Sequence, residues 1–301
     1  MRKKIKVGTR GSALAIAQTQ LVLGTILQKF PRLEFELVQI TTSGDLILDR
    51  TLDKVGGKGL FVKEIEHALD TGAIDLAVHS MKDIPAQVGA GLTIAAVSKR
   101  EDPRDVLIAA PGMKLAELPG GAVIGTSSIR RETQLLEKRP DFKVAMLRGN
   151  VVTRIDKFLQ RQYDGIVLAA AGLKRLGLAD KVSQFFEVDE MIPAVCQGIL
   201  AIQTRAADDN GYLLESVHCE EAALCAGAER AYMIRLNGGC VTPIAAHAVI
   251  DGARMTVRGM LADDKKGRIF RATVSGNKGE AAMLGDQLAD LILAQTGGTP
   301  Q

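Results

Sequence analysis

The chain has 301 residues, of which 47% are hydrophobic and 24% are charged, and its formal net charge is +3. This length favours two or three domains, and the composition is that of an ordinary globular protein. No apolar run approaches the roughly 18 residues that span a bilayer, and so small a net charge argues against a nucleic-acid-binding surface. We therefore expect neither a membrane segment nor a nucleic-acid partner.

The N-terminus is basic, since no acidic residue precedes Glu34. It could be taken for a targeting peptide. However, polar residues interrupt the apolar stretch, and residues 4–9 already have the pattern of a strand. We interpret this segment as part of the fold and expect a cytoplasmic protein.

Strand-like and helix-like segments alternate through the first two thirds of the chain. Apolar runs predict strands at 4–9, 34–40, 74–78, 92–97, 106–110, 123–125, 144–147 and 166–168. Helices are predicted from Ser12, over 61–69, and from Ser127, Asn150 and Ala170. Such alternation is typical of parallel sheets with crossover helices.

Two segments echo each other. Residues 7–12 (VGTRGS) and 124–128 (IGTSS) both have the pattern of a strand, a Gly-Thr turn and a serine-capped helix. Two similar α/β domains facing each other across a cleft would explain this echo, and chance similarity of two such units is the alternative. In each domain a helix N-terminus would favour a bound anion.

The last third has a different pattern. A helix is predicted over 220–236, followed by strands at 244–250, 255–262 and 268–275 and a helix at 279–295. This order predicts a small α+β domain with a three-stranded antiparallel sheet. We expect three domains, with these bounds: 1–98 together with 197–217, 99–196, and 218–301.

One long segment, 41–59, has no predicted helix or strand and contains four glycines. Structureless stretches of this length are uncommon in compact domains unless they act as lids or are disordered. Because it follows a strand at the presumed cleft, we interpret it as a mobile lid.

A polar cluster follows the strand predicted at 74–78. It contains His79, Ser80, Lys82 and Asp83, and Pro85 prevents a long helix from continuing it. The cluster is thereby placed at the carboxyl end of a buried strand, where α/β folds bind ligands. Asp83 is the strongest candidate for a catalytic group, and a turn-capping aspartate is the alternative interpretation.

Basic residues are in local excess further along the chain. Between Lys99 and Arg161 there are 13 Lys and Arg residues against 8 Asp and Glu residues. The excess favours a cleft for small carboxylates or phosphates, and a solvated face is an equally good explanation on charge alone.

The four cysteines, Cys196, Cys219, Cys225 and Cys240, match no zinc-binding spacing, and we expect no metal site. A cytosolic chain should not depend on disulfides. Cys225 is predicted to be a small buried helix residue. Cys240 lies on a glycine-rich loop that would expose its thiol.

Taken in order, several motifs resemble the porphobilinogen deaminase family. They are VGTRGS (7–12), KVGGKGLF (54–61), VHSMKD (78–83), REDPRD (100–105), GTSS (125–128), LRGNV (147–151), AAGLKRLG (170–177) and GGC (238–240). Any one of them is a weak signal, but the same order over most of the chain is specific. The resemblance implies two doubly wound α/β domains around a cleft, similar to periplasmic binding proteins, plus a small α+β C-terminal domain.

The resemblance also implies a function. Enzymes of this family are transferases of porphyrin and heme biosynthesis that join four porphobilinogen molecules, release ammonia at each addition, and free the linear tetrapyrrole hydroxymethylbilane. They carry a covalent dipyrromethane cofactor on a cysteine, and Cys240 matches that cysteine. Asp83 matches the catalytic aspartate, and Lys82 beside it would hold a substrate carboxylate or tune Asp83. The family further suggests a monomer.

Other roles follow from position in the motifs. Residues expected to contact the cofactor are Ser80, Lys82, Asp83, Ser128, Arg130 and Arg131. Residues expected to bind incoming substrate and the growing chain are Arg10, Ser12, Arg148, Arg154 and Arg175. Residues expected in the lid are Lys54, Lys58 and Phe61.

The chain departs from the family pattern at Cys196, where glycine is usual, and at Gln203, where an acid is usual. Neither change removes a residue with a chemical role. The main rival hypothesis is a two-lobed solute-binding protein for a small carboxylate, which fold alone does not exclude. A ligand-sensing regulator would need a DNA-binding module, and no helix-turn-helix pattern is evident.

Overall fold

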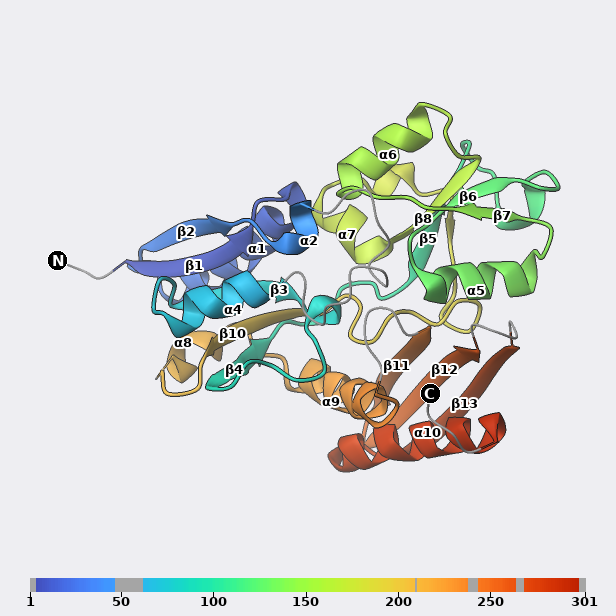
Figure 1. The fold of residues 1–301 in the computed structure, drawn as a ribbon. Coiled ribbons are helices and arrows are strands. Elements are labelled where there is room, and N and C mark those ends of the chain that lie inside the picture. Colours follow the sequence, from blue (N-terminus) through green and yellow to red (C-terminus); the bar gives the residue numbers. More distant parts are fainter. Residues whose placement is uncertain (1–3, 47–61, 209, 238–242, 264–267, 298–301) are drawn as a thin grey trace. The chain divides into compact units, whose positions relative to one another are not determined.

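The computed structural model describes residues 4–46, 62–208, 210–237, 243–263 and 268–297 (Figure 1). By its internal contacts the chain divides into two compact units. The first comprises residues 1–101 and 199–223, and the second comprises residues 102–198 and 224–301. The division into three domains stays a prediction.

The first unit is built on a five-stranded sheet. Its strands are β1 (Ile5–Arg10), β2 (Phe35–Ile40), β3 (Leu76–Ser80), β4 (Leu92–Val97) and β10 (Leu200–Arg205). Their order is β2-β1-β3-β10-β4. β1 is parallel to β2 and β3, whereas β10 is antiparallel to β3 and β4. The sheet is therefore mixed, and the prediction of a parallel sheet is wrong for β10, which the sequence pattern did not identify as a strand.

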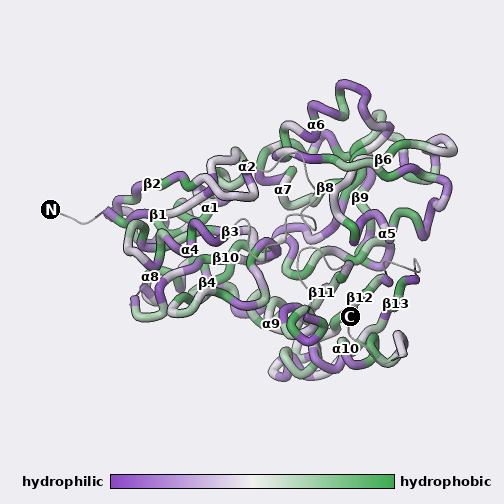
Figure 2. Tube along the Cα trace, in the orientation of Figure 1, coloured by the Kyte–Doolittle hydropathy of each residue, from purple (hydrophilic) through white to green (hydrophobic). Residues whose placement is uncertain are grey.

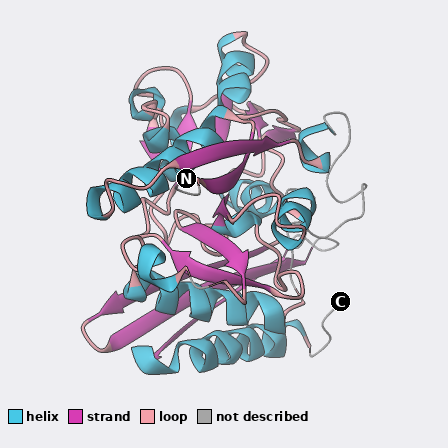
Figure 3. Cartoon of the chain, turned by 90° about the vertical axis from the view of Figure 1, so that its left-hand side faces the viewer, coloured by secondary structure: helices cyan, strands magenta, loops and turns pink. Residues whose placement is uncertain are grey.

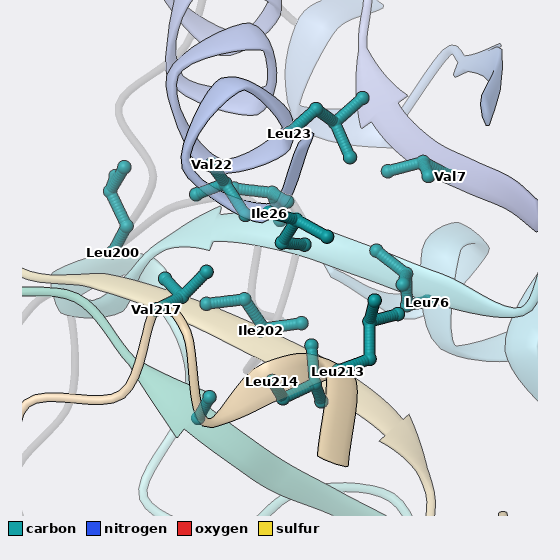
Figure 4. Close-up of a cluster of buried hydrophobic side chains, with 12 residues drawn as sticks. Val7, Val22, Leu23, Ile26, Leu76, Leu200, Ile202, Leu213, Leu214 and Val217 are labelled. Atoms are coloured by element: carbon teal, nitrogen blue, oxygen red, sulfur yellow. The ribbon is translucent and has the colours of Figure 1, made fainter. Parts of the chain in front are cut away.

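Helices cover both faces of this sheet because side chains alternate along each strand. Figure 4 shows Leu76 of β3 and Ile202 of β10 packed with Ile26 of α1 in one apolar cluster. On the opposite face, Ala77 packs with Ile65 of α4. The helices of this unit are α1 (Ala13–Lys29), α2 (Ser43–Leu46), α4 (Lys63–Asp70) and α8 (Gly211–Leu214), with the 3-10 turn η1 (Met81–Asp83).

The second unit contains a second five-stranded sheet with the same plan. Its strands are β5 (Asp105–Ile108), β6 (Val123–Gly125), β7 (Lys143–Ala145), β8 (Gly165–Ala169) and β9 (Gln184–Phe185). Their order is β7-β6-β8-β5-β9, with β6 parallel to β7 and β8 and with β5 antiparallel to β8 and β9. This repeats the order and directions of the first sheet strand for strand. The prediction of two similar α/β domains is confirmed.

The helices that accompany the second five-stranded sheet are short. They are α5 (Ile129–Lys138), α6 (Val151–Leu159), α7 (Ala170–Arg175) and the 3-10 turns η2 (Leu115–Glu117) and η3 (Ala179–Lys181). The helix predicted from Ser127 begins at Ile129 instead, because Ser128 is its N-cap and its hydroxyl accepts from the Arg131 backbone N–H at 3.4 Å.

The C-terminal segment forms the predicted three-stranded antiparallel sheet. Its elements are α9 (Glu220–Arg235), β11 (Ile244–Asp251), β12 (Arg254–Asp263), β13 (Arg268–Asn277), η4 (Lys278–Glu280) and α10 (Ala281–Thr296). Both α9 and α10 carry a mixture of hydrophobic and hydrophilic residues (Figure 2), and both helices run along the sheet (Figure 3). The two helices approach closely at Gly285, where a Cβ would lie 2.1 Å from the Ala228 carbonyl oxygen.

No helix within the described ranges is long and apolar enough to cross a membrane.

Candidate active site

The carboxyl edge of the first sheet carries the turn predicted to be catalytic. β1 and β3 are adjacent and parallel, with Val7 opposite Leu76, so both strands end at this edge. β3 runs directly into η1, where Lys82 and Asp83 are both partly exposed. Among the residues that the structure describes, none donates a hydrogen bond to the Asp83 carboxylate. Within the described residues, therefore, no donor competes with a cationic ligand for that carboxylate.

The last two residues of β3, His79 and Ser80, directly precede this turn and have polar side chains on opposite faces of the sheet. On one face, Gln18 of α1 donates to the Ser80 hydroxyl at 2.9 Å. On the other face, His79 is buried. Burial lowers the pKa of His79 to about 4; the carboxamide of Gln203 opposes this shift, and the charge of Arg10 adds to it. The His79 imidazole is consequently neutral at neutral pH.

Gln203, one of the two departures from the family pattern, has a defined place in the fold. Its amide donates to Glu66 of α4 at 2.8 Å, and the same Glu66 oxygen accepts from the Gly89 backbone N–H at 3.1 Å. Gln203 thus joins β10 to α4 with a neutral donor, where a second carboxylate would face that of Glu66.

Arg10, the last residue of β1, pairs with Asp45 of α2. Its Nε donates to both carboxylate oxygens at 3.2 Å, and its Nη2 also donates to Oδ1. Burial raises the pKa of Asp45, but hydrogen bonds from Arg10 and Thr42 outweigh it and hold this pKa below its usual value. The loop predicted over 41–59 therefore begins with a helical turn at 43–46, because Asp45 and Thr42 anchor it.

The two serine-capped helix starts are confirmed. The Ser12 hydroxyl accepts from the Ala15 backbone N–H at 3.2 Å, and Ser128 caps α5 in the same way. Ser12 follows β1, and Ser128 follows β6, which holds the same place in its sheet. Each serine therefore marks the carboxyl edge of its sheet.

The two adjacent arginines at the start of α5 are buried, not on the surface. Both pair with Asp105, the first residue of β5, which is fully buried. Arg130 Nη1 donates to Oδ2 at 2.7 Å, and Arg131 donates to Oδ1 through Nε at 3.1 Å and Nη2 at 2.8 Å. Gln197 donates to the same Oδ1 at 2.9 Å.

In this cluster the burial of Asp105 and the charges of the two arginines have opposite effects on the pKa of Asp105. Burial by itself would raise the pKa of Asp105, but the charges of Arg130 and Arg131 outweigh it and hold that pKa well below its ordinary value. Two guanidiniums against one carboxylate leave one net positive charge. Neither Asp105 nor Gln197 was predicted from the sequence to be a site residue. The available signal was a carboxylate at the start of an otherwise apolar strand.

The other predicted substrate-binding arginines lie at or near loops of the same unit. Arg154 Nε donates to the Gly149 carbonyl at 2.7 Å, and Arg175 Nη2 donates to the Gly198 carbonyl at 2.6 Å. Arg148 is partly buried, and its carbonyl accepts from Lys157. The loops after β6 and β7 are joined by Ser127, whose hydroxyl donates to the Leu147 carbonyl at 2.7 Å.

Four predicted residues, Lys54, Lys58, Phe61 and Cys240, lie outside the described residues. The other three cysteines form no disulfide bond within the described residues. Cys225 is buried in α9, as predicted. Cys196 is buried and adopts a left-handed backbone with φ of 60°, a conformation that glycine adopts without strain. Within the described ranges no group of three His, Cys, Asp or Glu side chains is arranged to hold a metal ion.

The structure thus brings the predicted residues together in two groups. In the first unit, the carboxyl edge of the sheet gathers Arg10, Ser12, Ser80, Lys82 and Asp83. In the second unit, Ser128, Arg148 and the start of α7 follow the parallel strands β6, β7 and β8 at one edge. The first group offers a partly exposed carboxylate, and the second offers mainly guanidiniums, which are natural partners of carboxylates.

Comparison with known proteins agrees with this chemistry. The family model for the porphobilinogen deaminase dipyrromethane cofactor binding domain matches residues 5–212, and the model for the C-terminal domain of the same enzymes matches residues 223–294.

Two full-length relatives give the same result. The porphobilinogen deaminase of Syntrophotalea carbinolica is 47% identical over 97% of this chain and 93% of its own length, and that of a Roseiflexus species is 47% identical over 99% and 98%. A solved substrate binding domain of a putative amino acid ABC transporter from Streptococcus pneumoniae has a TM-score of 0.44 and 15% identity, covering 77% of this chain and 98% of that one. The matches to the two family models and to these full-length relatives show that the chain belongs to the porphobilinogen deaminase family.

Proposed function

We propose that this chain joins four porphobilinogen molecules by successive deaminative condensations onto a covalent dipyrromethane primer, and then releases hydroxymethylbilane by hydrolysis. In this scheme it is a transferase of tetrapyrrole biosynthesis. One observation supports the catalytic assignment most directly: the partly exposed Asp83 carboxylate lies at the carboxyl edge of a sheet and accepts no hydrogen bond from the described residues.

Asp83 suits this chemistry for an electrostatic reason. When porphobilinogen loses ammonia, the carbon that carried the amine becomes part of a delocalised cation. A fixed carboxylate beside the pyrrole nitrogens stabilises that charge and then accepts the proton released by the attacked ring. Lys82 in the same turn supplies a cation for a substrate carboxylate. His79, neutral beneath the turn, contributes hydrogen bonding and not proton transfer.

The donors around α5 fit a dipyrromethane. Such a group carries acetate and propionate side chains, and Arg130 retains an Nε–Nη2 edge that bonds to no described residue. We assign Arg130, Arg131 and Ser128 to the cofactor side chains, together with Ser80, Lys82 and Asp83. The Cys240 thiolate, a strong nucleophile towards soft carbon, would form the thioether. When bound, the cofactor supplies the pyrrole terminus at which new units are added.

The remaining arginines would serve the growing chain. A chain of six pyrroles presents roughly a dozen carboxylates, which planar guanidiniums bind in bidentate fashion. Residues assigned to this role are Arg10, Ser12, Arg148, Arg154 and Arg175, with Lys54, Lys58 and Phe61 in a lid. We further propose a cytoplasmic monomer that binds porphobilinogen but neither nucleic acid nor membrane.

The decisive test is the intact mass of the purified protein. We expect an excess equal to two pyrrole units, which peptide mapping places on Cys240. Cys240→Ser should lack both the added mass and the activity, and it should be less stable because the bound polyanion that neutralises the arginines is missing. Cys196→Gly, Cys219→Ala and Cys225→Ala are the controls and should each keep the added mass.

The same measurement separates the proposal from its rival. A solute-binding protein would bind a small carboxylate reversibly and show no covalent addition. Added mass on any of the three control thiols would refute the assignment of Cys240, and an unmodified, inactive wild-type protein would refute the proposed function.

A further inference from the structure

The two sheets permit a position-by-position comparison around Asp105. Asp105 pairs with Ala169, the last residue of β8, and in the first sheet Leu200 pairs with Ser80, the last residue of β3. Asp105 and Leu200 therefore occupy equivalent positions on the two antiparallel strands. One sheet has a buried carboxylate where the other has a leucine.

The helices show the same replacement. Arg130 and Arg131 are the second and third residues of α5 after its cap Ser128. The second and third residues of α1 after its cap are Leu14 and Ala15. The ionic cluster of the second sheet thus corresponds to three apolar residues in the first. Since the same scaffold is built without these charges, the fold itself does not require them.

A buried ionic cluster is also a poor way to stabilise a fold, because desolvating the charges offsets most of their attraction. The geometry around Asp105 indicates another use. Arg131 directs Nε and Nη2 at Asp105 and Nη1 at the Val167 carbonyl, 3.0 Å away, so all its nitrogens are engaged. The protein thus fixes the position of Arg131, while each of its Nη atoms carries a second N–H with which it can contact a cofactor side chain.

Arg130 is held differently. Among the described residues, only its Nη1 has hydrogen-bond partners, donating to Asp105 and to the Ile192 carbonyl, the latter at 2.8 Å. Nε and Nη2 bond to no residue within the described part of the chain, although the side chain as a whole is buried. These two nitrogens form the edge of a guanidinium that binds a carboxylate in bidentate fashion.

We propose that Asp105 is a positioning residue for cofactor binding. It holds Arg131 as a buried support and orients Arg130 so that its Nε–Nη2 edge receives one carboxylate of the dipyrromethane. The bound carboxylate neutralises the single positive charge that the cluster leaves. This inference rests on the proposed function, because it assumes that the ligand of Arg130 is the cofactor.

The test compares Asp105→Leu and Asp105→Asn with wild type. Asp105→Leu places the residue of the first sheet in the second. In both variants we expect folded protein in which the fraction carrying the two-pyrrole mass falls by about tenfold or more, because a misdirected guanidinium loses a bidentate contact. Glu229→Gln is the control. It alters another wholly buried carboxylate of the same unit, one that accepts from the Ala248 and Cys196 backbone N–H groups, and should keep full loading even if its melting temperature falls.

A second variant covers the case in which unpaired arginines prevent folding. The triple variant Asp105→Leu, Arg130→Leu, Arg131→Ala copies the first sheet at all three positions, and we expect it to fold without cofactor. Restoring Arg130 alone in this background should not restore loading, because Asp105 no longer orients it.

The outcomes are distinct. Full loading of a folded Asp105→Leu or Asp105→Asn protein would overturn the positioning role while leaving the proposed function intact. Full loading after Arg130 alone is restored in the triple variant would overturn it as well. Wild-type protein without the two-pyrrole mass would instead refute the proposed function.

Discussion

The two five-stranded sheets end their equivalent central strands in different ways. In the first sheet, β3 ends in the 3-10 turn η1, which presents Lys82 and Asp83. In the second sheet, β8 runs directly into α7, whose last turn carries Lys174 and Arg175. One scaffold therefore exposes a carboxylate where the other continues into a helix that ends in basic residues. The difference lies in the residues after the strand, since the strand order is the same.

The polar groups buried in the two sheets also differ. The strands of the first sheet bury the neutral side chains of His79 and Gln203, and Gln203 donates to Glu66 of α4. In the second, Asp105 holds two guanidiniums. Because the apolar framework is equivalent, we attribute the difference to the ligands that each edge serves. The first edge would handle a developing cation, and the second would handle permanent anions.

The largest effect should come from the open carboxylate of the first sheet. Asp83→Asn keeps the size of the side chain but removes its charge, and we expect turnover to fall by at least about a hundredfold with the fold intact. Asp75→Asn is the control and should retain turnover, because Asp75 precedes the first residue of β3, at the opposite end of the strand from Asp83. Steady-state kinetics and thermal unfolding measure both; near-normal turnover of Asp83→Asn would remove the catalytic contrast between the sheets.

Acid should destabilise the two sheets in different pH windows. Burial lowers the pKa of His79 from its ordinary value near 6.5 to about 4, so the unfolded chain binds more protons than the native one between these values. The neutral His79 therefore contributes fully to stability above pH 6.5. As the pH falls to 4, this contribution is lost, and the free energy of unfolding decreases by about 2–3 kcal/mol. Asp105, whose pKa is depressed, loses its contribution only below about pH 3.9, the ordinary value of an aspartate.

Hydrogen exchange at a series of pH values resolves this difference by region. We expect β3 and α4 to lose protection before β5 and α5. His79→Asn should abolish the loss between pH 6.5 and 4, and His67→Asn, which alters an exposed histidine of α4, should not. Simultaneous loss of protection in both sheets would contradict the separate windows.

Substitutions of two arginines in the second unit should have smaller effects, and each should impair a different step. Arg131→Leu removes the support of the Asp105 cluster and should lower cofactor loading by about tenfold. Arg148→Leu should load the cofactor normally but stall during elongation, because a misplaced polyanion misorients the reacting carbon. Intact mass measures loading, and single-turnover assays measure elongation. Equal defects in the two variants would reject this division.

The smallest effects should be shared by both sheets. Ser12→Ala and Ser128→Ala each remove an N-cap hydrogen bond, and each should cost about 1 kcal/mol of stability. Thermal unfolding checks the two values. Only Ser128→Ala should also reduce loading, since we place Ser128 next to the cofactor. A marked difference in stability cost would show that the two helix starts are not equivalent.

Much of the site was predictable from sequence because its signals are local. The strand before Asp83 is an apolar run, the serine caps precede amphipathic segments, and Pro85 limits the turn. Asp105 was missed because its partners, Arg130 and Arg131, lie on a helix far along the chain. The burial of those arginines was unexpected for the same reason, since charged residues are seldom buried without a partner that pairs with them.

The sequence by itself determined most of the strands and helices in chain order, the repeated strand–turn–helix units, the antiparallel C-terminal sheet and the placement of Asp83 after a buried strand. Each depends on periodicity or capping over a few neighbouring residues. Only the tertiary structure decided that β10 returns between β3 and β4, that Asp105 carries two arginines, and that Gln203 meets Glu66. These features depend on pairing between distant segments, where geometry and burial select the partner and local pattern does not.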